Sequence, residues 1–276
     1  MIQDFNLHTH TIEFDGKNTA AEMVDVAVAC GIKTVGFSNH FIVHKNITGA
    51  NFYSYAVLGG YKNIYSDNFD KTILMFKKHY QDLEQVAAQK KVKILRGMEV
   101  DYFPNVHWVR GFENAMRVLK PDYLIGACHL FEFDGRLCNI HDIKMADADT
   151  QNKMLTVYWR KIQEIVKSGM FTFLAHIDLP RRVNLGLDDK WIDIEQQVVD
   201  VIAKNKIPVE INTALYKYCG QPHPTNRIMK MCADANVSMF LSDDSHHISQ
   251  VARNFEDAKK YADDFGVRLI GLDKII

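Results

Sequence analysis

The hydrophobic residues of this chain fall in short apolar runs separated by amphipathic segments. The runs are rich in β-branched and aromatic residues and predict strands at 1–7, 33–38, 92–100, 122–128, 170–175, 207–211, 237–241 and 267–270. Apolar positions spaced three to four residues apart predict helices at 19–30, 69–90, 108–119, 146–167, 189–204, 224–235 and 249–265. This makes about seven strand–helix units in unbroken alternation, which is typical of a parallel sheet, either open or closed into a barrel.

Two segments show neither period and are expected to be long loops. Residues 44–68 are rich in Asn, Gly and Tyr, and we expect this loop to form a lid over one face. Residues 131–145 form the second polar stretch. No linker rich in Pro, Gly or Ser and no repeat interrupts the alternation, which predicts a single domain over residues 1–276.

The composition limits the class of protein. The chain has 276 residues, 47% of them hydrophobic, which is enough for one large α/β domain. A net charge of −1 provides no field that would attract nucleic acid or an anionic membrane. No apolar run approaches the ~20 residues needed to span a bilayer, and no signal peptide is visible. The cysteines are odd in number and lack a C-x-x-C pair, which predicts reduced thiols in a cytoplasmic protein.

Metal-ligand residues follow the predicted strands. Two histidines, His8 and His10, come directly after the first strand, where residues i and i+2 point to the same face. In α/β barrels the catalytic groups come from the carboxyl ends of the strands. The candidate ligands, most of them at strand ends, are His8, His10, Asp15, His40, Glu99, His129, His176, Asp244 and His246.

These donors indicate a cluster of metal ions. They outnumber the four or so ligands that one zinc ion uses, so two or three divalent ions sharing a carboxylate are expected. Glu99 is assigned as the bridge, because it stands alone on a central strand. The mixture of imidazole and carboxylate suits Zn, Mn or Fe. Clustered ions favour phosphate ester hydrolysis, because they activate water and neutralise charge on the phosphate.

The order of these motifs resembles that of the PHP (polymerase and histidinol phosphatase) superfamily. The resemblance implies a distorted (β/α)7 barrel, TIM-barrel-like, with a site for two or three metal ions. By position, it assigns the first ion to His8, His10, Glu99 and Asp244, the second to Glu99, His129 and His176, and the third to Asp15, His40 and His246, with Glu13 as an alternative to Asp15. The matching pieces are His8-Thr9-His10-Thr11 with Asp15-Gly16, Ser38-Asn39-His40, Gly97-Met98-Glu99, Cys128-His129, Ala175-His176-Ile177-Asp178 and Asp244-Ser245-His246.

Within the superfamily, the chain length and residues 209–213 and 247–252 resemble the stand-alone histidinol-phosphate phosphatases. This implies hydrolysis of L-histidinol phosphate in histidine biosynthesis, with Glu99 and Asp244 in catalysis. The loop at 137–141 lacks the Gly-Trp-Pro-like stretch often found in those phosphatases, so another small phosphomonoester, such as a mononucleotide, stays open. A catalytically silent metal-binding regulatory barrel is the second alternative, and competent donors at all ligand positions argue against it. The oligomeric state is left open.

Cationic residues are expected to hold the phosphate. Bidentate pairing of arginine with phosphate makes Arg160, Arg181 and Arg182 the candidates, with solvated surface charge as the alternative for each. His44 lies in the first long loop and is a further candidate for substrate contact.

Two other residues have weaker assignments. Asp178 is expected either to donate a proton to the leaving group or, preferably, to orient His176 from behind. His79 lies in the middle of a predicted helix, so it is expected at the surface or core edge, where its substitution should change little.

Overall fold

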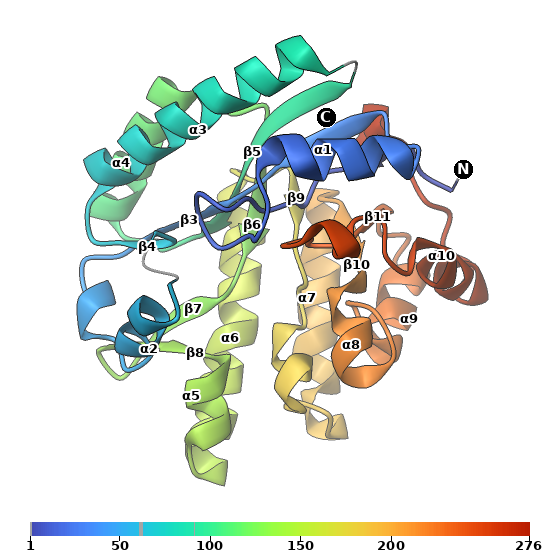
Figure 1. Cartoon of the computed structure of the whole chain (residues 1–276). Helices are drawn as coiled ribbons and strands as arrows, with labels where there is room; N and C mark the ends of the chain where they lie inside the picture. The colour runs from blue at the N-terminus through green and yellow to red at the C-terminus, as the bar shows by residue number, and fades with distance from the viewer. Residues whose placement is uncertain (1, 61–62, 91) are drawn as a thin grey trace. The chain divides into compact units, whose positions relative to one another are not determined.

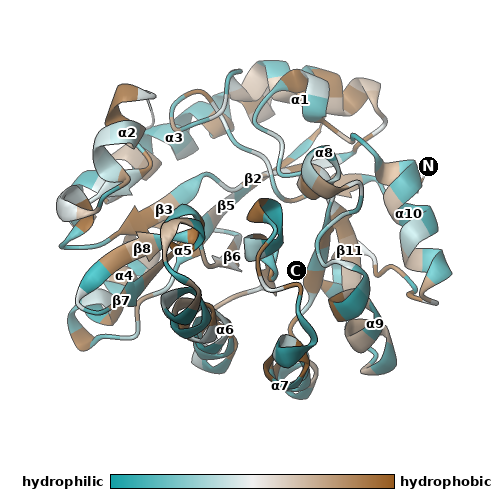
Figure 2. Ribbon diagram, turned by 90° about the horizontal axis from the view of Figure 1, so that it is seen from below, coloured by the Kyte–Doolittle hydropathy of each residue, from teal (hydrophilic) through white to brown (hydrophobic). Residues whose placement is uncertain are grey.

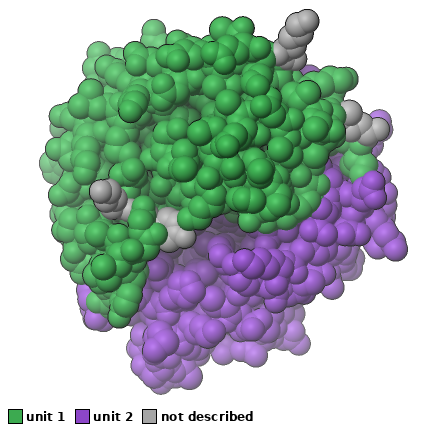
Figure 3. Space-filling view, in the orientation of Figure 1, with its two compact units in different colours: residues 1–125, 242–253, 276 green, residues 126–241, 254–275 purple. Residues whose placement is uncertain are grey.

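The computed structural model describes residues 2–60, 63–90 and 92–276 (Figure 1). Met1 of the first predicted strand and residues 61–62 of the first predicted loop lie outside these ranges. The chain forms two compact units, coloured green and purple in Figure 3. Unit 1 comprises Met1–Ile125, Ser242–Arg253 and Ile276, and unit 2 comprises Gly126–Leu241 and Asn254–Ile275. A single domain over 1–276 stays a prediction.

The strands of unit 1 form a parallel sheet. Phe5 pairs with Thr34, and Thr34 pairs with Lys93, so β1, β2 and β5 run side by side. Strand β3 also pairs with β5, and its register places His40 opposite Glu99. The elements of this part of the chain are β1 Phe5–Asn6, α1 Ala20–Ala29, β2 Thr34–Phe37, β3 His40–Val43, α2 Tyr53–Leu58, β4 Tyr65–Ser66, α3 Phe69–Gln89, β5 Lys93–Asp101 and α4 Val106–Leu119.

Helices α1 and α3 of unit 1 begin at side-chain caps. Thr19 and Glu22 form a capping box at the start of α1, each bonding to the other's backbone N–H. The Asn68 side chain accepts hydrogen bonds from two N–H groups at the start of α3. Helix α3 contacts both β5 and α4 (Figure 1). Its inner face buries Phe76 and Leu83, and burying such side chains contributes roughly 1.5–3 kcal/mol each.

Strand β6 contains the chain boundary between the two units, after Ile125. The strand order is β1-β2-β5-β6-β9-β10-β11, and the Ala175 N–H donates to the Gly126 carbonyl beside β9. The Phe173 and Phe240 rings meet edge to face in the core, 4.8 Å apart. The elements of this part are β6 Tyr123–Ala127, β7 Leu130–Phe133, β8 Arg136–Asn139, α5 Ile140–Met145, α6 Ala148–Ser168, β9 Phe173–Leu174, α7 Ile192–Asn205, β10 Val209–Asn212, α8 Tyr216–Cys219, α9 Asn226–Asp234, β11 Met239–Ser242 and α10 Phe255–Asp264.

The two predicted loops contain secondary structure, so this part of the prediction is wrong. Residues 131–145 hold most of the antiparallel hairpin β7–β8 and all of α5. The hairpin turns at Asp134 and Gly135, both with positive φ, and an Asp-Gly turn between apolar runs is a strong hairpin signal. Residues 44–68 contain α2 and β4.

Near the C-terminus, two predicted elements are shorter than expected. The helix predicted at 249–265 begins only at Phe255, after a short 3-10 turn. The strand predicted at 267–270 is reduced to one bridge between Leu269 and Met239.

The long helices of unit 2 have one buried and one exposed face. Hydrophobic and hydrophilic residues both occur along α6 and α7 in Figure 2. Helix α6 buries Tyr158, Trp159 and Ile162, while its exposed positions after Ala148 are charged. Within residues 2–60, 63–90 and 92–276, no helix has the length and apolar character needed to cross a bilayer.

Candidate metal centre

Backbone hydrogen bonds bring the two ends of unit 1 together. Thr9 pairs with Ser245 as a parallel bridge, and the His10 N–H donates to the Ser245 carbonyl at 2.9 Å. The loop after β11 therefore runs beside the loop after β1. This pairing delivers Asp244 and His246 next to His10.

A tight turn places Asp15 at the same point. The N–H groups of Phe14 and Gly16 both donate to the Thr11 carbonyl, at 3.1 and 2.9 Å. A Cβ on Gly16 would lie 2.7 Å from the Thr11 backbone, so only glycine allows the chain to turn this closely. The turn points the Asp15 carboxylate back toward the loop that contains His10.

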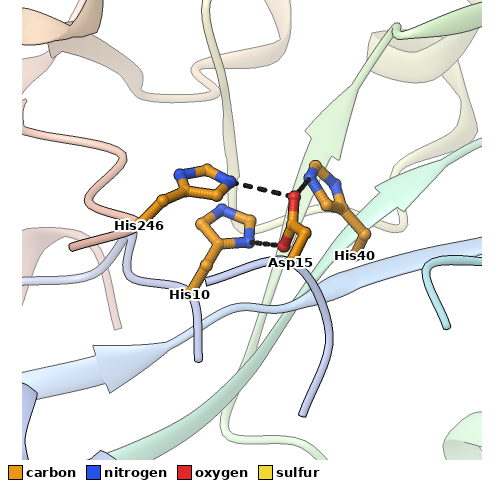
Figure 4. A group of neighbouring side chains, drawn as sticks. All are labelled: His10, Asp15, His40 and His246. Carbon is orange, nitrogen blue, oxygen red and sulfur yellow. Dashed lines mark hydrogen bonds and ion pairs between the residues drawn. The ribbon is translucent and has the colours of Figure 1, made fainter. Parts of the chain in front are cut away.

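The Asp15 carboxylate faces three imidazoles (Figure 4). Its Oδ2 lies 3.1 Å from His40 Nε2 and 3.0 Å from His246 Nε2, and its Oδ1 lies 3.4 Å from His10 Nδ1. His10 and His246 also stack, with ring centroids 4.0 Å apart. The four residues each offer one ligand atom, all within 4.8 Å of one another.

Glu99 and Asp244 form a second set of contacts in unit 1. Glu99 Oε2 lies 2.9 Å from His40 Nδ1 and 3.3 Å from His8 Nε2. Asp244 Oδ1 lies 3.2 Å from His10 Nε2 and 3.5 Å from His8 Nε2. His8, His10 and Asp244 form a further group able to hold an ion. Of the nine predicted ligands, seven therefore lie together in unit 1.

The cluster is strongly coupled electrostatically. Burial disfavours the charged forms of Asp15 and His40, yet each stabilises the other's charge. The histidines around Asp15 hold the pKa of its carboxyl well below the usual range, despite its burial. The carboxylates of Asp15 and Glu99 raise the pKa of His40 well above its usual value, against the effect of burial. Burial lowers the pKa of His10, helped by the nearby His246.

The residues fit a resident divalent ion. His10 is fully buried, and within the described chain neither of its ring nitrogens makes a hydrogen bond. Asp15 Oδ1 likewise makes no hydrogen bond there. Buried polar atoms normally have partners, and a metal ion is the partner that unites imidazole nitrogen with carboxylate oxygen.

Two predicted ligands have backbone conformations that are rare for their residue types. Asp244 has a φ of 48° and His176 a φ of 21°. Such conformations cost free energy and cluster at functional sites. In both loops the surrounding residues are buried and hydrogen-bonded, which holds the side chain in place.

In unit 2, His129 and His176 lie beside each other. Their ring centroids are 4.9 Å apart and meet edge to face. The His176 backbone N–H donates to the Glu210 carboxylate at 3.0 Å, and the Asn212 amide donates to the same oxygen at 2.6 Å. Glu210 therefore fixes the loop that carries His176, a contact that the sequence analysis did not identify.

Asp178 bonds to His223 and not to His176, so the preferred orienting role is wrong. Its Oδ1 lies 2.5 Å from His223 Nδ1, and its Oδ2 accepts from the Thr225 N–H and hydroxyl, both at 2.8 Å. Burial opposes the charged form, but His223 and Thr225 lower the pKa of Asp178. A carboxylate with this pKa stays ionised, which argues against a proton-donor role. No local pattern in the sequence marks His223 as a partner.

The predicted arginines have different surroundings. Arg181 is buried, donating to Glu195 at 2.6 Å and to the Leu185 carbonyl at 2.9 Å, which argues against phosphate contact. Arg182 is exposed and stacks over the Tyr218 ring. Arg160 is also exposed, at a surface pocket shared with α7. Phosphate binding by any of them stays a prediction.

His44 and His79 both lie in the interior of unit 1. His44 is buried against Phe103 and accepts a hydrogen bond from the Asn46 N–H at 3.2 Å. His79 is also buried, and its Nε2 lies 2.9 Å from the Asn39 amide nitrogen. The surface or core-edge placement expected for His79 is therefore wrong.

Residues 4–214 match the family model of the PHP domain. The chain belongs to the PHP domain family. A relative from Deinococcus radiodurans, named probable histidinol-phosphatase, is 23% identical over 188 residues, 68% of this chain and 70% of the relative. A Thermotoga maritima protein of the same name is 24% identical over 143 residues, 51% of this chain and 60% of the relative.

Two solved structures show the same fold as this PHP chain. The hisK protein of Listeria monocytogenes aligns with a TM-score of 0.72 at 17% identity, over 92% of this chain and 99% of that one. The histidinol phosphate phosphatase of Lactococcus lactis, complexed with Zn, L-histidinol and phosphate, aligns with a TM-score of 0.68 at 15% identity, over 97% of this chain and 95% of that one. The likeness confirms the predicted TIM-barrel-like fold class.

Proposed function

We propose that this PHP chain is a metal-dependent phosphatase that hydrolyses L-histidinol phosphate to L-histidinol and inorganic phosphate. The observation that carries the proposal is the Asp15-centred group of donors in unit 1, in a chain that belongs to the PHP family. The relatives named as histidinol-phosphatases support the choice of substrate. A small phosphorylated substrate also agrees with a chain that has a net charge of only −1.

We assign the metal ligands by combining these groups with the family resemblance. His8, His10 and Asp244 would hold one ion together with Glu99, and Asp15, His40 and His246 would hold another. We further propose that His129 and His176 complete the ligand set together with Glu99. When bound, divalent ions such as Zn, Mn or Fe would lower the pKa of a water molecule, so that it loses a proton and becomes able to attack phosphorus. The ions would also neutralise charge on the phosphate.

The protein's own residues then have three tasks. Buried histidines and carboxylates hold the donor atoms at fixed positions, which removes the need to reorganise them during the reaction. Asp244, whose side chain is more exposed than those of Asp15 and Glu99, is the carboxylate proposed to accept a proton from the attacking water. Arg160 and Arg182 are the exposed cations proposed to bind the phosphate.

The test is phosphate release by the purified chain. Protein loaded with Zn or Mn should release phosphate from L-histidinol phosphate, and chelator-treated protein should not. A panel of mononucleotides and other small phosphomonoesters measures substrate preference. Release from another ester alone would reject the substrate and retain the reaction class. Metal binding with no release from any ester would instead indicate the catalytically silent barrel.

A further inference from the structure

A buried hydrogen-bond network lies behind the loops that carry His10 and His40. Asn39 precedes His40, and Thr11 follows His10. The Thr11 N–H donates to Asn39 Oδ1 at 2.8 Å, and Asn39 Nδ2 donates to Thr11 Oγ1 at 3.0 Å. Thr11 and Asn39 are completely buried. The two loops are therefore joined directly through the Asn39 amide.

His79 completes this network from helix α3. Its Nε2 lies 2.9 Å from Asn39 Nδ2, and its side chain is buried. A backbone N–H can only donate, so the Thr11 contact fixes the Asn39 amide with its oxygen toward Thr11. The Asn39 nitrogen then has one hydrogen for Thr11 and one for His79. His79 must accept at Nε2, which makes its imidazole neutral with the proton on Nδ1.

The surroundings of His79 agree with a neutral ring. Phe14, Phe37 and Phe76 meet its imidazole edge to face, at centroid distances of 5.6, 6.4 and 6.4 Å. Burial lowers the pKa of His79 to about 4, against the opposing effect of the Asp82 charge. His79 is therefore held as one neutral tautomer, with Nε2 facing the Asn39 amide.

We infer that His79 is a positioning residue that fixes the Asn39 amide and thereby the separation of the loops carrying His10 and His40. The inference rests on the proposed metal-dependent function. Without the acceptor at position 79, one amide hydrogen of the buried Asn39 lacks a partner. Because an unpaired buried donor is costly, the amide then shifts toward another partner, which strains its bonds to Thr11 and changes the spacing of both ligands.

Three variants test the inference. His79→Leu removes the acceptor, whereas His79→Gln places an amide oxygen near the position of Nε2. Phe76→Leu is the matched control, because Phe76 lies one turn earlier on α3, is fully buried and contacts the His79 ring, but has no hydrogen bond to offer. Folding is checked by circular dichroism and thermal unfolding before metal retention is measured.

The measured quantity is zinc affinity, obtained by competition with a chromophoric chelator, together with kcat and KM for L-histidinol phosphate. Outer-shell substitutions typically cost about 10–100-fold in metal affinity or activity. We expect His79→Leu to lose affinity in this range, His79→Gln to recover most of it, and Phe76→Leu to lose stability but not affinity.

Unchanged zinc affinity in a folded His79→Leu protein would overturn the inference, as would an equal loss in Phe76→Leu. The outcome is separate from the substrate. If the unmodified chain binds zinc but does not release phosphate, the proposed function fails while the affinity series still decides the role of His79. If it binds no zinc, both fail.

Discussion

Glu99→Gln removes a charge from the cluster with little change in shape. Glu99 is 1% exposed, and its Oε2 lies within 2.9–3.6 Å of nitrogens on His8, His10 and His40. Two unit charges about 4 Å apart interact by about 4 kcal/mol at an effective dielectric constant near 20. Since about 1.4 kcal/mol is a factor of ten, losing this charge should weaken retention of at least one ion by about 10³-fold.

Turnover should fall by a similar factor, because the loss of an ion removes the activation of water. The fold should persist, because the backbone contact at this position does not use the side chain. The Glu99 N–H bonds to the Ser38 and Asn39 carbonyls, both at 3.1 Å, and so ties β5 to the residues just before β3. Metal content after dialysis is measured by mass spectrometry, and turnover by phosphate release. Glu22→Gln, at an exposed helix cap, is the control. Full metal content with near-normal turnover in Glu99→Gln would refute the bridging assignment.

Three further outcomes are expected. Asp15→Asn should lower metal retention at least about tenfold in chelator competition while Glu13→Gln should not, and the reverse result would move the ligand to Glu13. Gly97→Ala should lower the free energy of unfolding by about 1–3 kcal/mol in urea titrations, because the added Cβ would lie 2.2 Å from Tyr123 Cζ; an unchanged midpoint would contradict this close contact. Between pH 6.5 and 4 the unfolded state gains a proton at His79 that the folded state, with a pKa of about 4, does not bind. Metal-free protein should therefore lose up to about 3 kcal/mol of stability relative to His79→Gln as the pH falls through this window, and parallel pH profiles would rule out the buried neutral ring.

The alternation of apolar runs was sufficient to predict the main strands and helices. It also placed the ligands, because a residue after a parallel strand lies at the carboxyl edge of the sheet whatever its side chain packs against. His40 and Glu99 lie within neighbouring strands instead, and the parallel register of β3 and β5 places them opposite each other. Periodicity failed in 131–145, where Asp134 and Gly135 carry the turn signal and the flanking strands are too short to show a clear period.

Side-chain partners were much harder to predict than positions. Asp178 lies two residues from His176, yet it bonds to His223, 45 residues away in the chain. Arg181 has the sequence context of a phosphate ligand but is paired with Glu195. Such pairings depend on rotamers and tertiary packing, which no local sequence pattern encodes. His79 was misjudged for the same reason, because its burial comes from aromatic residues on other segments.

The pairing of Thr9 with Ser245 has a consequence for how the protein is made. Asp15 and His246 are 231 residues apart in the chain and 3.0 Å apart in the folded protein. Asp15 therefore emerges from the ribosome long before His246 is synthesised. A nascent chain that stops short of Ser242 carries His10 and Asp15 but lacks Asp244 and His246. Neither donor group of unit 1 is complete until residues 242–246 have been synthesised, so stable metal capture there distinguishes a polypeptide that contains this segment from one truncated before it.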